Sequence, residues 1–296
     1  MFFGGKMKIL NFGSMNYDYV YAVPRIVTGG ETLTTTGMET FLGGKGFNQS
    51  VALIKAGALV YHAGFVGEDG DEFIEACKRY GIQTNYVRKI EGRSGHTIIQ
   101  VDRDAQNCIL LYPGANRKLT KKFIDEVLAD FESGDFLILQ NEMNEIDYII
   151  EKAYEIGMII VLNPSPYDGF MEACDLNKVN YFIMNEVEGE QITGETDPEK
   201  IVTRMLENYP KAKIVLTLGK EGSMYKDADT EYHQPIFPVK AIDTTAAGDT
   251  FTGYFVAAVL NGGTVLKSLE LGAKAASITV TRAGASPSIP YKSEVE

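Results

Sequence analysis

The chain has no tryptophan, only three cysteines and three histidines, and fewer basic than acidic residues. Cys77, Cys108 and Cys174 are widely spaced and form no CxxC pair, which argues against a disulfide scaffold or a zinc site. The histidines are equally scattered, so the sequence supports neither a histidine metal centre nor a Ser-His-Asp triad. Carboxylates, amides and backbone groups therefore remain as the candidates for chemistry.

The charge balance is negative, with 28 basic against 40 acidic residues and a formal net charge of −12. Such a chain is repelled by nucleic acids and by anionic membranes, so we expect neither as a partner. The N-terminal segment from Met1 to Lys8 has no hydrophobic run long enough for membrane insertion or export. We therefore expect a cytoplasmic protein.

With 296 residues, 45% of them hydrophobic, the chain can bury a large core in a single domain over residues 1–296. Strand and helix patterns alternate along it, which predicts an α/β fold with a mostly parallel sheet covered by helices. Strands are expected at 9–13, 60–66, 136–139, 158–162 and 214–218, and helices at 49–56, 72–80 and 146–154. Two stretches, about 14–42 and 84–112, have period-two patterns without intervening helices and predict a small antiparallel β lid.

In the segment Asp243-Thr-Thr-Ala-Ala-Gly-Asp249, a carboxylate stands behind small residues where an amphipathic helix is expected to begin near Gly248. The first N–H groups of a helix lack partners, and Ala246, Ala247 and Gly248 have too little bulk to keep an oxyanion away. Asp249 is then placed to accept a proton from a hydroxyl that attacks a phosphoryl group. Taken alone, a simple helix cap would be the better explanation of this carboxylate.

A second glycine-rich turn, Gly43-Gly44-Lys45-Gly46-Phe47-Asn48-Gln49, also leads into a helical pattern. It is not a P-loop, because Gly46 follows Lys45 where Ser or Thr is needed. It is not a dinucleotide fingerprint either, because Gln49 stands where that motif needs glycine. A flexible loop or a tight helix–strand contact explains such a run equally well, although Lys45 and Asn48 favour a polar ligand.

Together with further motifs, these two turns resemble the ribokinase family of sugar kinases over nearly the whole chain. The other matching segments are Gly13-Ser14-Met15-Asn16-Tyr17-Asp18, Gly30-Glu31-Thr32, Gly64-Phe65-Val66-Gly67-Glu68-Asp69, Pro113-Gly114-Ala115-Asn116, Asn163-Pro164-Ser165-Pro166, Asn185-Glu186-Val187-Glu188, Thr217-Leu218-Gly219 and Gly284-Ala285-Ser286-Pro287-Ser288. Their order and spacing carry the resemblance. It implies a ribokinase-like three-layer α/β/α domain that binds ATP and a small sugar.

The resemblance implies roles for individual positions on the sugar side. Carboxylate and amide oxygens accept hydrogen bonds from sugar hydroxyls, while lysine and amide N–H groups donate them. Asp249 matches the catalytic base, and the turn from Ala246 to Gly248 matches the anion hole. The implied sugar contacts are Asn16, Asp18, Gly44, Lys45, Asn48, Glu142 and Asp249.

The resemblance also implies nucleotide and cation positions. Asn185 and Glu188 match a region that organises magnesium and phosphates, and magnesium is expected to arrive bound to ATP. Thr217, Gly219 and Gly222 match positions on the nucleotide side, together with Gly248. A monovalent-cation site for potassium is implied at Asp243, Thr245, Thr279, Arg282, Gly284 and Ser288.

Three positions depart from the family pattern and leave the identity of the sugar open. Tyr17 stands where a small residue is usual, but strand alternation places it on the face opposite Asn16 and Asp18. Thr97 adds a hydroxyl where an apolar residue would be expected to line the sugar pocket. Phe47 replaces a smaller residue in the glycine turn.

The expected activity is transfer of the γ-phosphate of ATP to a primary hydroxyl of a small sugar, with D-ribose as the favoured acceptor. Within the family, another sugar or a nucleoside is the alternative, and a non-catalytic sugar-binding regulator is the alternative from another class. The lid is expected to close over the sugar and exclude water. Because it exposes one sheet face when alone, we expect a homodimer that pairs two lids.

Overall fold

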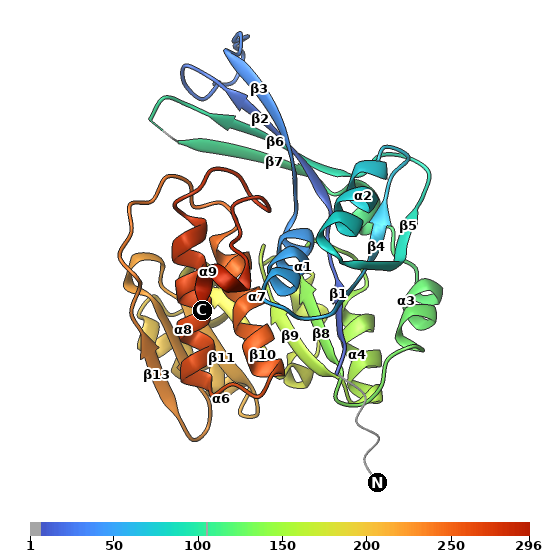
Figure 1. Ribbon diagram of the computed structural model, residues 1–296, viewed down its shortest axis with the longest axis vertical. Helices are drawn as coiled ribbons and strands as arrows, with labels where there is room; N and C mark the ends of the chain where they lie inside the picture. The colour runs from blue at the N-terminus through green and yellow to red at the C-terminus, as the bar shows by residue number, and fades with distance from the viewer. Residues whose placement is uncertain (1–6, 105) are drawn as a thin grey trace.

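Short apolar strands pair side by side into the large sheet of the protein. The computed structural model describes residues 7–104 and 106–296, so residues 1–6 and 105 of the predicted domain lie outside the described residues. Nine strands have the order β13-β12-β11-β10-β9-β8-β1-β4-β5, parallel from β11 to β5 (Figure 1). Their bounds are β1 Ile9–Phe12, β4 Val60–Val66, β5 Gln83–Lys89, β8 Phe136–Gln140, β9 Ile159–Asn163, β10 Tyr181–Asn185, β11 Lys213–Thr217, β12 Ser223–Lys226 and β13 Glu231–Gln234.

Side chains alternate across this sheet and build one core on each face. On β1, for example, Leu10 and Phe12 enter one core while Ile9 enters the other. The first core is covered by α3 Lys121–Leu128, α4 Ile146–Ile156, α5 Glu186–Thr193 and α6 Pro198–Asn208. The second is covered by α1 Lys45–Lys55, α2 Asp71–Tyr80, α7 Ala247–Leu260, α8 Val265–Thr279 and α9 Lys292–Val295. The predicted three-layer α/β/α arrangement with a mostly parallel sheet is therefore confirmed.

A separate four-stranded sheet forms the lid, which projects above the large sheet in Figure 1. Its strands, in the order β3-β2-β6-β7, are β2 Asn16–Ala22, β3 Gly37–Gly43, β6 Gly95–Val101 and β7 Asn107–Tyr112. The outer pairs are antiparallel as expected, but β2 and β6 run parallel. They do so because β2 follows the end of β1 and β6 follows the end of β5, so both leave the same edge of the large sheet.

The second predicted lid stretch differs from the structure at its start. It was expected to begin at about residue 84, but β5 pairs in parallel with β4 in the large sheet. The pairing follows from the connection, since β4, α2 and β5 form a strand–helix–strand unit that returns the chain to the same sheet. The four-stranded sheet thus takes only β6 and β7 from this stretch.

The chain reverses its direction of travel across the large sheet at β1. From β1 the order runs outward through β4 to β5, and the chain then returns to β8 on the other side of β1 and continues to β9. In open α/β sheets, ligands bind in the crevice outside the carboxyl ends of the strands at such a switch point. The topology therefore points to the segments that follow β1 and β8. Within residues 7–104 and 106–296, no helix has the length and apolar character needed to cross a membrane.

A close contact between α1 and α7 determines how the two glycine turns meet. A Cβ atom built on Gly253 would lie 2.4 Å from Cβ of Ala52 and 2.9 Å from the backbone nitrogen of Leu53. The two helices can approach this closely only because Gly253 has no side chain. One turn before this contact, Asp249 of α7 lies beside Asn48 and Gln49 of α1.

Replacing Gly253 by alanine should therefore destabilise the protein, although alanine is the better helix former. We expect Gly253→Ala to lower the free energy of unfolding by about 1–3 kcal/mol, because the added methyl group forces α1 and α7 apart. Denaturant unfolding measures the change. Gly169→Ala is the control, since a Cβ there meets nothing within 4 Å; an unchanged stability in Gly253→Ala would contradict the close contact.

Candidate active site

The segments that follow β1 and β8 meet, as the topology indicates. The hydroxyl of Ser14 donates to the carboxylate of Glu142, and the backbone N–H of Lys45 donates to the same carboxylate at 3.0 Å. Gly46 N–H in turn donates to the Ser14 hydroxyl at 3.2 Å. Burial raises the pKa of Glu142, although Lys45 and Ser14 oppose the rise. Glu142 thus ties the glycine turn of α1 to the end of β8.

Asp249 is a buried carboxylate of the site, with 8% of its surface exposed. Asn48 Nδ2 donates to its Oδ2 at 3.1 Å, and Gln49 Nε2 donates to its Oδ1 at 3.0 Å. Burial raises the pKa of Asp249, while the positive charge of Lys45 and the two amide donors act against it. A carboxylate held in this way is a better base than a solvated one.

The start of α7 lies where the sequence predicted it, at Ala247, and its first turn is open. Ala246 caps the helix in the left-handed conformation, with φ 60°, a strained geometry for a residue with a side chain. Within the described chain, the backbone N–H groups of Gly248 and Asp249 donate to no protein group. Together with the positive end of the helix dipole, they form a ready site for an anion beside Asp249.

Three predicted sugar contacts gather on the lid side of the site. Asp18 accepts a hydrogen bond from the hydroxyl of Thr97 at 2.6 Å, and Asn16 accepts one from Asn116 at 2.7 Å. Burial raises the pKa of Asp18 to about 6, helped by the charges of Glu142 and Asp249 and opposed by Thr97. Gly44 stands next to Asn16 with φ 93°, and a Cβ on it would lie 2.9 Å from the backbone nitrogen of Asn16.

Two of the three unusual residues turn away from this site. The hydroxyl of Tyr17 donates to the carbonyl of Asp69, and its ring packs on Phe73 at 4.7 Å, which confirms that it faces away from Asp18. Phe47 has no exposed surface and packs edge-on against Phe73 at 5.4 Å. The ring of Phe47 thus belongs to the core between α1 and α2. Thr97 does reach the site, through Asp18.

The side chain of Lys45 brings a positive charge close to the carboxylates of the site. Burial would lower the pKa of Lys45, but the charges of Asp249, Glu142 and Glu188 outweigh burial and raise it. The ammonium group therefore stays charged. Glu188 follows β10, whose carboxyl end lies at the same edge of the large sheet as the carboxyl ends of β1 and β8.

Asn185 and Glu188 form a capping box at the start of α5. The side chain of Asn185 accepts from the backbone of Val187 and Glu188, and Glu188 accepts from the backbone N–H of Asn185 at 2.9 Å. On the neighbouring strand, Thr217 pairs with Asn185 in register. Gly219 and Gly222 follow in a tight turn in which both have positive φ. The predicted nucleotide positions thus share one edge of the sheet.

The six positions matched to a potassium site are brought together in part. Asp243 accepts hydrogen bonds from Thr245 and from the backbone N–H of Gly284 at 2.9 Å, which joins the loop before α7 to the loop after α8. Burial would raise the pKa of Asp243, but these hydrogen bonds outweigh it and lower that pKa. The hydroxyl of Thr279 bonds to Thr250 between α7 and α8.

The other two members of that set use their side chains elsewhere. The guanidinium of Arg282 donates to Glu294 at 2.6 Å, and the hydroxyl of Ser288 donates to the carbonyl of Ala285 at 2.7 Å. A guanidinium is itself a cation, so Arg282 could contribute to a cation site only through its backbone carbonyl. In the described ranges, 7–104 and 106–296, no group of three or more His, Cys, Asp or Glu residues could hold a metal ion.

Several functional neighbours were missed by the sequence reasoning. Gln49 was given no role in the site by the sequence, yet its side chain bonds Asp249. Gln140 and Asn11 are buried amides that bond to each other at 3.0 Å, and Gln140 also bonds Gln49. The sequence did contain a sign of these residues, because each of the otherwise apolar strands β1 and β8 contains one polar amide side chain.

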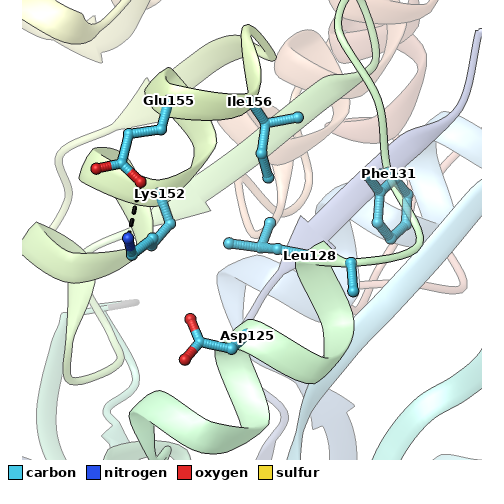
Figure 2. Close-up of a pocket in the computed structure, with 7 residues that line it drawn as sticks. Asp125, Leu128, Phe131, Lys152, Glu155 and Ile156 are labelled. Carbon is cyan, nitrogen blue, oxygen red and sulfur yellow. Dashed lines mark hydrogen bonds and ion pairs between the residues drawn. The ribbon is translucent and has the colours of Figure 1, made fainter.

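A groove of about 280 Å³ lies far from these residues, between the ends of α3 and α4 (Figure 2). Leu128, Phe131 and Ile156 line it, and the charge of Lys152 at its rim is paired with Glu155 at 2.7 Å. It faces the amino ends of β8 and β9, whereas Asp249 and Glu142 lie at the carboxyl ends. The groove therefore takes no part in the candidate active site.

Comparison with known proteins agrees with this geometry. Residues 6–292 match the family model of the pfkB family of carbohydrate kinases. Ribokinase from Bacillus subtilis is 32% identical over 288 residues, covering 96% of each chain, and deoxyribokinase from Salmonella typhimurium is 31% identical with the same coverage. A solved structure of Arabidopsis thaliana ribokinase with ribose and ATP superposes with a TM-score of 0.87 at 27% identity, covering 98% of each chain.

An α/β fold with a switch point at β1, a helix N-terminus with unpaired N–H groups and a buried carboxylate beside it is the arrangement expected of a phosphoryl-transfer enzyme. The full-length match is more specific. The chain belongs to the pfkB family of carbohydrate kinases.

Proposed function

We propose that this protein transfers the γ-phosphate of ATP to a primary hydroxyl of a small sugar, with D-ribose as the favoured acceptor and ribose 5-phosphate as the product. The observation that carries the proposal is the position of Asp249, buried in the first turn of α7 beside two unpaired backbone N–H groups. The Asp249 carboxylate accepts the proton of the attacking hydroxyl. The N–H groups of Gly248 and Asp249 stabilise the charge of the transferred phosphoryl group.

The sugar is held by the residues between the lid and α1. Asn16 and Asp18 accept from its hydroxyls, while Lys45 and Asn48 supply donors next to Asp249. Asn48 also has a carbonyl oxygen that no group in the described chain satisfies, which makes it an available acceptor. Glu142 holds the glycine turn through Lys45 N–H, and its charge favours the ammonium form of Lys45.

The nucleotide lies on the side of Asn185, Thr217 and the turn at Gly219 and Gly222. Magnesium bound to ATP would neutralise phosphate charge, and Glu188 is the carboxylate of this edge placed to support it. Potassium would be held near Asp243 and Gly284, where the two loops are joined, by backbone and hydroxyl oxygens of the set that the sequence proposed. Oxygen donors without nitrogen or sulfur suit such a hard cation.

Two alternatives concern the same site. A deoxyribokinase is nearly as similar to this chain as a ribokinase, 31% against 32%, so the 2-hydroxyl of the sugar is the feature to test. Thr97 favours a change in acceptor, because it bonds directly to Asp18. A sugar-binding regulator without turnover is less well supported, since Asp249 and the open helix start are both intact.

The lid also supports a proposal about assembly. Every described residue of β7 is exposed, including Ile109 at 53% and Leu110 at 62%, and β7 is an edge strand. An exposed apolar edge strand is a site for pairing with another chain. We infer that two lids pair in a homodimer, which covers this strand in each copy.

The activity is tested by ADP release over a panel of D-ribose, 2-deoxy-D-ribose, other sugars and nucleosides, with magnesium and ATP. We expect D-ribose to give the highest kcat/KM and potassium to raise it over tetramethylammonium. Asp249→Asn should reduce kcat by about 10²–10⁴-fold, because the base is lost, while sugar binding persists. Near-normal turnover by Asp249→Asn would rule out Asp249 as the base, and sugar binding without turnover in the wild type would favour the regulator.

Sugar affinity should weaken at acidic pH because of Asp18. Its pKa of about 6 means that the carboxylate accepts hydrogen bonds from hydroxyls above pH 6 and is protonated below it. We expect the sugar Kd, measured calorimetrically without ATP, to rise about tenfold per pH unit below 6. Thr97→Val removes a hydrogen bond that lowers this pKa, so the inflection should move to higher pH. An inflection that stays in place in Asp18→Asn would show that another group is responsible.

The assembly is tested by sedimentation equilibrium across the micromolar range. Leu110→Lys should shift the protein from dimer to monomer, because a charge would be buried between the two lids. Leu266→Lys is the control, since Leu266 is 50% exposed on α8, away from the lid. A monomeric mass of the wild-type protein over the whole concentration range would contradict the proposed homodimer.

A further inference from the structure

Gln49 contacts Asp249 but cannot contact a substrate. Its side chain is fully buried in α1, and its Nε2 donates to Oδ1 of Asp249 at 3.0 Å. The side chain of the adjacent residue, Asn48, donates to the other carboxylate oxygen of Asp249. Of these two amide residues, Asn48 is the one proposed to contact the sugar. Each oxygen of Asp249 therefore has its own amide donor, and only one donor belongs to the sugar site.

The amide of Gln49 can donate to Asp249 only if its oxygen faces the other way, and Gln140 enforces this. Gln140 Nε2 donates to Oε1 of Gln49 at 2.8 Å and to Oδ1 of Asn11 at 3.0 Å. If the amide of Gln140 were rotated by 180°, its oxygen would face Oε1 of Gln49 and Oδ1 of Asn11, and neither bond could form. Within the described chain Oε1 of Gln140 has no partner, so this buried amide leaves its acceptor unsatisfied while both donor bonds are made.

The orientation of Gln140 is fixed in turn from β1. Because Oδ1 of Asn11 accepts from Gln140, its Nδ2 donates, at 2.8 Å each, to the carbonyl of Gly46 and the hydroxyl of Ser50. Both acceptors lie on α1, the helix that carries Gln49. The amides of β1 and β8 thus hold α1 at a fixed distance from the sheet and fix the direction in which Gln49 points.

The far end of the chain of hydrogen bonds is uncharged. Ser50 accepts from Asn11 and donates to Nδ1 of His62 at 2.8 Å, so Nε2–H of His62 donates to the carbonyl of Gly13 at 3.0 Å. Burial lowers the pKa of His62 to about 4, so the ring is neutral near pH 7. Amides do not exchange a proton along such a chain, so the network orients Asp249 rather than relaying protons.

We propose that Gln49, oriented by Gln140 and Asn11, is the positioning residue that holds Asp249 in line for phosphoryl transfer. The proposal rests on the function proposed above and extends it to residues that touch neither sugar nor nucleotide. A base displaced by about 1 Å can lose 10²-fold in rate, so a fixed direction for one carboxylate oxygen matters to catalysis.

The same contact controls the protonation of Asp249. The charged groups that face Asp249 are Lys45 from α1, Asp18 from β2 and Glu142 from the segment after β8. Lys45 and the two amide donors favour the carboxylate, and burial opposes it. Losing the Gln49 donor leaves those charges in place and removes one stabilising bond, so the pKa of Asp249 must rise.

The test compares Gln49→Met, which keeps the length of the side chain but removes the donor, with the wild type. We expect kcat to fall about 10- to 100-fold while the sugar KM changes less than about threefold, because only the base is displaced. The acidic limb of the kcat profile should move to higher pH. Gln140→Met should move the acidic limb in the same direction, but by less. Ser268→Ala, which removes a buried hydroxyl group on α8, is the control and should leave the acidic limb in place.

A double-mutant comparison separates positioning from general damage. In the Asp249→Asn background, Gln49→Met should cause no further loss of the residual rate, because its effect acts through Asp249. A further loss of the same size, or a loss in Gln49→Met with an unmoved acidic limb, would overturn the proposal. If Gln49→Met does not fold, Gln49→Glu keeps the acceptor for Gln140 and should raise the pKa of Asp249 still more.

A readout independent of turnover distinguishes this proposal from the function it rests on. The carboxyl signal of Asp249 in protein labelled with ¹³C-aspartate is identified by its absence in Asp249→Asn. Its titration midpoint should be higher in Gln49→Met than in the wild type even if no tested sugar is a substrate. An unchanged midpoint would refute the contact, whereas a raised midpoint without any kinase activity would refute the proposed function alone.

Discussion

The fold of this protein must hold a carboxylate out of water without a cation bonded to it. Asp249 is nearly buried, and its direct partners are the neutral amides of Asn48 and Gln49, with the charge of Lys45 acting through space. Burying a charge costs much more than burying an amide, so each of these donors has to be in place. The close approach of α1 and α7 at Gly253 and the amides of β1 and β8 satisfy that requirement from opposite sides.

The position of β1 explains why the two glycine turns meet at all. Because β1 lies between β4 and β8, the turn after it opens at the point where neighbouring connections leave in opposite directions. The chain uses that opening twice, first for the turn into α1 and later for Glu142. In the same region the start of α7 adds a helix N-terminus, which lies beside Asn48 and Gln49 of α1.

Much of this arrangement was predictable from local patterns. The alternation of strands and helices predicted the layers, and the small residues before Asp249 predicted where α7 begins. The contact of Gln140 with Gln49 was not predictable, since the residues are 91 positions apart and their pairing depends on how α1 packs across β1 and β8. The orientation of Phe47 depends likewise on the helix α2, which the glycine turn alone does not reveal. The roles of individual site residues stay predictions.

The parallel pairing of β2 with β6 has a consequence for how this lid is inherited and exchanged. Its two halves enter from the ends of β1 and β5, and 51 residues of α1, β4, α2 and β5 separate the end of β3 from the start of β6. The lid therefore cannot be exchanged as one continuous segment. A chimera that takes its lid from another protein needs two separate inserted segments, and the strand order at β1 must match in both proteins. Recombination by a single crossover anywhere between β3 and β6 would join halves from different parents along their central pair of strands.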